Sequence, residues 1–216
     1  MTAPPDLPRA TYRLQFHAGF DFAAAEAVVP YLARLGVSHV YASPIWRARP
    51  GSTHGYDVVD HAAINPELGG RAAFERFSDT LLAHGLGLIV DAVPNHMGIG
   101  YDNPWWVDML AWGERSPFAA YFDIDWRPTE ATLAGKVLLP VLGDHYGRVL
   151  SEGYLVPGLD GGRIVVRYHD HTVPIAARDH AEILSGAAQH AGKDGPAEAA
   201  AALDELAALA RGIAGR

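Results

Sequence analysis

The sequence predicts an α/β protein built on a parallel β-sheet, and three observations support this prediction. β-prone and amphipathic helical segments alternate over the first 100 residues, as they do in βαβ units. Residues 86–93 (LGLIVDAV) are apolar apart from Asp91, which is typical of a parallel strand buried on both faces. After Gly98 the alternation stops, and short β-prone runs separated by Gly and Pro predict a small β-rich insertion.

The expected elements of the first part follow one another along the chain. They are strands at 11–17, 37–45 and 86–93, and helices at 20–35 and 71–84. Phe22, Val29 and Leu32 share one face of the first helix, in which Pro30 should cause a kink or mark a late start. The second helix repeats apolar residues at spacings of three and four, and a glycine follows each helix. The segment 47–70 is predicted to be a polar loop.

The rest of the chain divides into a β-rich part and an Ala-rich part. Pro104 begins a short predicted helix, and strands are expected in three runs, KVLLPVLG, RVLSEGYLV and RIVVRYH. Residues 186–196 are the best candidate for a linker, and leucines at helical spacing predict a terminal helix. The expected organisation is therefore three βα units at 1–100, an inserted domain at 101–175 and a helical segment at 176–216.

Composition excludes several classes of protein. The chain has 216 residues, a formal net charge of −8 and no cysteine. Disulfides and thiolate chemistry are excluded, and an acidic balance disfavours nucleic acid as a partner. No apolar run is long enough to cross a membrane, and no secretory signal is visible at the start. These features predict a cytoplasmic protein that acts on a small molecule or a sugar.

The loop GSTHGYDVVD places Tyr56, Asp57 and Asp60 just beyond a predicted strand end. Binding sites of parallel sheets collect at the carboxyl ends of the strands. A tyrosine there can stack on the apolar face of a sugar ring, while its hydroxyl forms a hydrogen bond. The alternative is that Tyr56 packs under its own loop, and the local sequence leaves both interpretations open.

Asp91, Asn95 and His96 end the third predicted strand in DAVPNHMG. A carboxylate that closes an apolar strand needs a partner, because an unpaired buried charge is costly. We expect Asp91 to pair with an arginine from a neighbouring strand and to organise the floor of a pocket. A neutral His96 can donate a hydrogen bond to a substrate hydroxyl. The alternative is a strand-end turn shaped by Pro94 and Asn95.

Other conspicuous residues receive a structural interpretation. The eleven histidines include His169 and His171 around Asp170, but they lack the helical spacing of a zinc site. Trp105, Trp106, Trp112 and Trp126 are candidate sugar platforms, although tryptophans so close together more often form a local core. No dinucleotide fingerprint, phosphate loop or nucleophile elbow is present. We therefore predict no metal and no cofactor.

Two motifs carry a resemblance to a known family. DAVPNH at 91–96 resembles the first signature region of the α-amylase superfamily of glycoside hydrolases, and HGYDVVDHAAINPELGG at 54–70 resembles the stretch after its second barrel strand. The opening from TYRLQFH to GYDVVD and the run KVLLPVLGDHYGRVLSEGYL at 136–155 are similar to a trehalose-forming branch of that family. The resemblance covers about residues 10–180.

This resemblance implies the N-terminal part of a (β/α)8 barrel, strands 1–3, with a small domain inserted after the third strand. It implies a maltooligosaccharide substrate whose reducing-end α-1,4 linkage is isomerised to α,α-1,1. Tyr56 and His96 would line the subsite of the transferred glucosyl ring, and Asp91 and Asn95 would shape its floor. The position of Asn95 is a calcium ligand in some α-amylases, but the other ligands of such a site are not evident in the sequence.

In this family the carboxylates that attack and protonate the glycosidic bond follow later strands, which nothing in this sequence resembles. We therefore predict no catalytic residue in the chain, which is expected to be a fragment that is inactive alone. Two alternatives remain. One is a fragment of another α-glucan hydrolase or transglycosylase, and the other is a non-catalytic α/β module that binds α-glucans.

Overall fold

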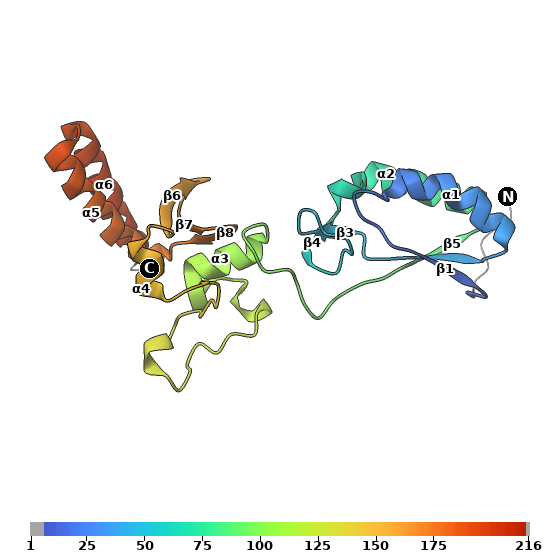
Figure 1. Ribbon diagram of the computed structural model, residues 1–216, viewed down its shortest axis with the longest axis horizontal. Coiled ribbons are helices and arrows are strands. Elements are labelled where there is room, and N and C mark those ends of the chain that lie inside the picture. Colours follow the sequence, from blue (N-terminus) through green and yellow to red (C-terminus); the bar gives the residue numbers. More distant parts are fainter. Residues whose placement is uncertain (1–6, 215–216) are drawn as a thin grey trace. The chain divides into compact units, whose positions relative to one another are not determined.

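The computed structural model describes residues 7–214 (Figure 1), and the chain divides into two compact units, Met1–Asn103 and Pro104–Arg216. Across the described residues, no helix combines the length and the apolar character that crossing a bilayer requires.

The first unit is built on a three-stranded parallel sheet. Its strands are β1 (Thr11–Leu14), β2 (His39–Ala42) and β5 (Gly87–Val90), in the order β1-β2-β5. Helix α1 (Phe22–Leu35) connects the first two strands, and helix α2 (Gly70–Ala83) precedes the third. The two helices lie along the same side of the sheet (Figure 1) and pack against each other. The predicted strand–helix alternation is therefore confirmed.

Helix α1 shows how local sequence sets its boundaries. The Asp21 carboxylate accepts a hydrogen bond from the Ala24 amide at 2.9 Å and caps the first turn. Gly36 ends the helix with φ +86°, a left-handed conformation that glycine adopts without steric cost. The helix begins at Phe22 and continues through Pro30, so Pro30 does not mark a late start.

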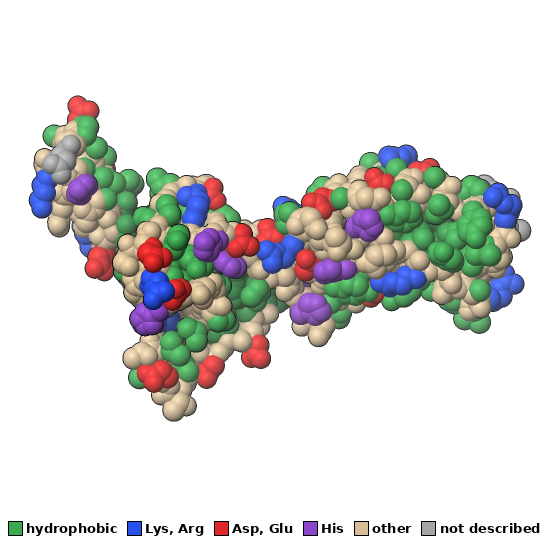
Figure 2. Space-filling view, in the orientation of Figure 1, with side chains coloured by type: hydrophobic (Ala, Val, Ile, Leu, Met, Phe, Trp, Pro, Cys, Tyr) green, Lys and Arg blue, Asp and Glu red, His purple; other side chains and the backbone are tan. Residues whose placement is uncertain are grey.

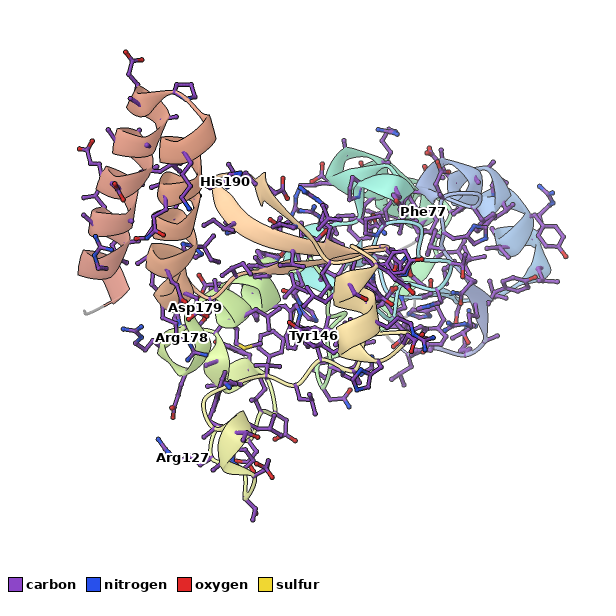
Figure 3. The ribbon with its side chains drawn as sticks, turned by 60° about the vertical axis from the view of Figure 1, so that its left-hand side comes forward. Phe77, Arg127, Tyr146, Arg178, Asp179 and His190 are labelled. Carbon is purple, nitrogen blue, oxygen red and sulfur yellow. The ribbon has the colours of Figure 1, made fainter. Side chains whose placement is uncertain are left out.

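An aromatic cluster fills the space between the helices and the sheet. Phe16, Phe22 and Phe77 (Phe77 is labelled in Figure 3) are at most 1% exposed. The Phe77 ring lies 5.9 Å from that of Phe16 and 6.0 Å from that of Phe22, measured between centroids. Aromatic rings at these separations add favourable quadrupole interactions to the burial of apolar area. The predicted apolar face of α1 is part of this core.

Two expectations for this unit are wrong. The segment predicted as a polar loop contains an antiparallel pair of strands, β3 (Trp46–Ala48) and β4 (Val58–Ile64), followed by a 3-10 turn at Pro66–Leu68. The start of β4 is buried, so this pair has its own apolar contacts. Strand β5 is half-buried rather than buried on both faces, because both helices of the unit cover the same side of the sheet.

The second unit combines an antiparallel sheet with a helical pair. Strands β6 (Val156–Asp160), β7 (Arg163–Tyr168) and β8 (His171–Pro174) pair in sequence order. Its helices are α3 (Pro104–Trp112), α4 (Tyr146–Ser151), α5 (His180–Asp194) and α6 (Ala197–Ala214). Helices α5 and α6 pack side by side (Figures 1 and 3).

Three details predicted for this unit are wrong. Residues 136–143 form no strand, and residues 146–151 form helix α4, whose first turn is capped by the His145 ring accepting from Gly147 N at 3.3 Å. The expected linker at 186–196 is mostly the second half of α5. Its alanines favour a helix, and the break is confined to Gly195 and Pro196, since proline cannot donate a helical hydrogen bond.

Two of the clustered tryptophans pack on neighbouring aromatic rings. Trp105 stacks on Phe118 with centroids 5.2 Å apart and planes 9° apart, and Trp106 contacts the Phe122 ring edge-on at 5.1 Å. The interpretation of these two residues as a local core is confirmed.

Candidate functional site

Polar side chains converge at the carboxyl ends of the three parallel strands. Arg13 lies in β1, Tyr41 lies in β2, and Asp91 directly follows β5. Tyr56 reaches the same place from the loop between β3 and β4, and its hydroxyl lies 2.5 Å from Asp91 Oδ2. This is the edge at which parallel sheets form their binding sites.

Asp91 is the centre of this group. Its Oδ2 atom accepts hydrogen bonds from the hydroxyls of Tyr56 and Tyr41, the latter at 2.9 Å, and lies 3.7 Å from Arg13 Nη1. The hydrogen bond from Tyr56, assisted by Tyr41 and Arg13, lowers the pKa of the carboxyl, although partial burial acts in the opposite direction. The predicted pairing of Asp91 with an arginine is confirmed, but this arginine, Arg13, lies on β1, which β2 separates from β5, and not on a neighbouring strand.

Arg13 contacts each member of the group. Its Nη2 atom donates to the Tyr56 hydroxyl at 3.0 Å and to Gln15 Oε1 at 2.9 Å, and its guanidinium lies 5.0 Å from the centroid of the Tyr41 ring. The hydrogen bond with Tyr56 raises the pKa of Arg13, and the bond to Asp91 raises the pKa of Tyr41. The geometry therefore favours a charged Arg13–Asp91 pair beside a neutral Tyr41.

The hydrogen-bonding capacity of the Tyr56 hydroxyl is largely used within the protein. A phenol has one proton to donate, and this proton goes to Asp91, while Arg13 occupies an acceptor position. The preceding residue fixes the loop: Gly55 has φ +77°, and a Cβ atom there would lie 2.6 Å from the Pro44 carbonyl oxygen. Tyr56 itself is half-buried.

The loop that carries Tyr56 lies next to the segment that carries His96. His96 is exposed, and its Nε2 atom lies 3.1 Å from the backbone carbonyl oxygen of Tyr56. A carbonyl only accepts, so this contact requires the ring proton on Nε2. The other ring nitrogen, Nδ1, lies 3.2 Å from Asn95 Oδ1, and in this tautomer both of these atoms are acceptors. The expected proximity of Tyr56 and His96 is therefore confirmed.

Asp57 and Asp60, which were also candidates from the sequence, form local hydrogen bonds with residues close to them in the chain. Ser52 Oγ donates to Asp57 Oδ1, and the Ala62 amide donates to Asp60 Oδ1 at 2.8 Å. Sequence reasoning missed Arg13 and Tyr41, although a signal was available. Both lie on predicted strands close to their carboxyl ends, where polar side chains of neighbouring strands meet.

The described residues contain no group of three or more His, Asp or Glu that is arranged to hold a metal ion. His171 Nε2 lies 3.6 Å from Asp170 Oδ1, and both residues are exposed at the turn that leads into β8.

Replacing Asp91 with Asn should flatten the acid limb of the stability profile. Because the folded-state pKa of Asp91 is lowered, its contribution is complete above about pH 4, the unfolded value, and is lost as the pH falls through the folded-state pKa. Urea unfolding at pH 6 and pH 3 should therefore show a smaller difference for Asp91→Asn than for the unchanged chain. Asp79→Asn, an exposed position on α2, is the control. Equal differences in all three proteins would contradict the expectation.

Comparison with known proteins identifies the family. The α-amylase catalytic domain family matches residues 25–142, and the chain belongs to this family. The predicted fold class, an α/β chain forming part of a (β/α)8 barrel, is confirmed.

Three relatives place the chain within that family. A Mycobacterium tuberculosis protein named "Putative maltooligosyl trehalose synthase" is 48% identical over 141 residues, which cover 62% of this chain and 18% of the relative. The structure of a maltooligosyltrehalose synthase from Arthrobacter ramosus has a TM-score of 0.68 and 42% identity over 78% of this chain and 21% of its own. A cyclomaltodextrinase from a Bacillus species is 31% identical over 153 residues, covering 63% of this chain and 26% of the relative. The chain thus spans about a fifth to a quarter of the length of these relatives.

Proposed function

We propose that this chain forms one wall of the α-glucan-binding cleft of an enzyme that isomerises the reducing-end α-1,4 linkage of maltooligosaccharides to α,α-1,1. The observation that carries the proposal is the meeting of the Tyr56 and His96 loops at the carboxyl ends of the parallel strands. The names of the more similar relatives, both trehalose-forming synthases, support the choice of reaction.

Each residue has a distinct role in this proposal. Tyr56 offers its ring face to the glucosyl unit, since its hydroxyl proton is donated to Asp91. His96 is exposed beside it, and its Nε2–H, which is donated to the Tyr56 carbonyl oxygen in this structure, would turn to a sugar hydroxyl when the substrate binds. Asp91 holds the floor together with Arg13, and Asn95 lies beside the His96 ring and shapes the loop under it.

The chain's own residues would bind and orient the sugar, and they would not break the glycosidic bond. Retaining glycoside chemistry needs one carboxylate that attacks the anomeric carbon and one carboxylic acid that protonates the leaving oxygen. Asp91 suits neither task, because its charged oxygen is held by two phenols and an arginine. We therefore assign no catalytic residue here and propose that both carboxylates come from outside this chain.

The proposal also covers the domain organisation of the chain and its location in the cell. We propose that residues 1–100 supply the first three βα units of the barrel, that 101–175 form an inserted domain, and that 176–216 form a helical segment. The absence of cysteine supports a cytoplasmic site of action.

Product analysis tests the proposed reaction. The whole enzyme that contains this chain should convert a maltooligosaccharide into a non-reducing product of the same mass, measured as a loss of reducing ends without release of glucose. Steady release of glucose or maltose as the main product would instead indicate a hydrolase, as the similarity to a cyclomaltodextrinase allows. Binding of maltooligosaccharide without any turnover would favour a non-catalytic glucan-binding module.

A further inference from the structure

The second unit contains an open pocket that the proposed function does not use. Its volume is about 410 Å³, within the range of small-molecule sites. The wall is formed by the end of α3, the segments around Trp126 and 135–139, the end of β8 and the turn before α5. Apolar side chains such as Met109, Val137 and Val173 make up much of its lining.

The charge of this pocket is opposite to that of the unit around it. Residues 104–216 contain ten Lys and Arg against fifteen Asp and Glu, and Figure 2 shows acidic and basic side chains interspersed on the face in view. The pocket, in contrast, is lined by three basic residues, Arg115, Lys136 and Arg178, and one acidic residue, Glu114. Two of these charges have partners outside the lining: the Glu114 carboxylate is paired with Arg127 at 3.1 Å, and Arg178 Nε lies 3.9 Å from Asp179 Oδ1. A pocket with surplus positive charge attracts anions.

The side-chain hydrogen-bonding groups of the pocket are mainly donors. Within residues 7–214, the Lys136 ammonium and the indole nitrogens of Trp112 and Trp126 have no protein partner, whereas Glu114 already accepts from Arg127. The carbonyl oxygen of Gly135 also has a donor, Arg178 Nη1, at 3.4 Å. Arg178 lies where the chain enters α5 (Figure 3). A neutral sugar needs acceptors as well as donors for its hydroxyls, so a donor-rich site is better matched by an anion.

We propose that this pocket binds a small organic phosphate of about the size of a sugar phosphate. The phosphate would meet Lys136 and Arg178, while the apolar face of the ring would pack on Trp112 or Trp126. None of its lining residues belongs to the first unit, which carries Tyr56 and His96. The proposal therefore does not depend on the proposed isomerase activity.

The two lysines of the chain provide a matched test. Lys136 lines the pocket, whereas Lys193 is exposed on α5 and does not. Glucose 6-phosphate is titrated into residues 1–216, and binding is measured by calorimetry and by the quenching of tryptophan fluorescence. Lys136→Ala should weaken binding about tenfold, the effect of losing one charged hydrogen bond, and Lys193→Ala should leave it unchanged. Reductive ¹³C-methylation labels both lysines, and only the Lys136 resonance should shift.

Two further ligands distinguish the sources of affinity. Inorganic phosphate should bind more weakly than glucose 6-phosphate, since it lacks the apolar ring, and glucose should bind more weakly still. Equal affinity for inorganic phosphate would reduce the site to an adventitious anion site and overturn the proposal. Equal affinity for glucose, no binding of glucose 6-phosphate, or equal effects of the two lysine substitutions would overturn it as well.

Discussion

Replacing Tyr56 with Ala in the whole enzyme should lower kcat/KM for maltooligosaccharides by about a hundredfold, the loss expected when a positioning surface in a glycosidase cleft is removed. The substitution deletes the ring proposed to face the sugar, and it also removes a hydrogen-bond partner of Arg13 and Asp91. Tyr56→Phe keeps the ring and deletes only the hydroxyl. Its expected loss is smaller, about tenfold, because the ring remains while its anchoring is weakened.

Initial rates at subsaturating and saturating substrate measure both variants. Tyr31→Ala, an exposed tyrosine of α1 that is 55% exposed, is the control and should retain full activity. The proposed role of the ring requires Tyr56→Phe to be clearly more active than Tyr56→Ala. Equal losses in both variants would show that the hydroxyl carries the whole effect, and full activity of Tyr56→Ala would remove this residue from the cleft.

Replacing Phe77 with Ala should reduce the free energy of unfolding by about 3–5 kcal/mol, the usual cost of truncating a buried phenylalanine. Its ring is 0% exposed and contacts Phe16 edge-on and Phe22 in a stacked arrangement. Removal leaves a cavity between α1, α2 and the sheet, and rigid neighbours close such a cavity only partly. Denaturant unfolding monitored by circular dichroism gives the value.

Leu82→Ala is the matched control for this measurement. Leu82 lies on the same helix but is 46% exposed, so its truncation should cost less than about 1 kcal/mol. Phe77→Leu should fall between the two variants, since it keeps most of the apolar volume. A loss for Phe77→Ala no greater than that for Leu82→Ala would contradict the assignment of the aromatic cluster as the core of this unit.

Local patterns predicted the elements of the first unit well where apolar spacing and end signals agreed. In α1, Asp21, the buried face and Gly36 all indicate the same helix. Prediction failed where a strand depended on a partner. The run at 136–143 is β-prone but forms no strand among the described residues, whereas Val58, taken as loop, pairs with Ala48 of β3. Strand formation requires a ladder between distant segments, which composition alone does not reveal.

The residues of the candidate site also divide into those that local sequence predicts and those that depend on distant partners. Tyr56, Asp91 and His96 were found because their motifs are local and carry a family resemblance. Arg13 and Tyr41 were missed because their importance arises only when β1, β2 and β5 align in register. Arg13 is separated from Tyr56 by 43 positions and reaches it across the end of the sheet. A charged residue on a short strand looks like an ordinary exposed residue until its partners are placed.

The order of the parallel strands has a consequence for how this protein is made. β1, β2 and β5 stand next to one another in the same order in which they occur in the chain. When β2 leaves the ribosome, the strand it pairs with has already been synthesised, and the same holds for β5. No strand must be inserted later between two earlier ones, so the sheet can grow from one edge in the direction of translation.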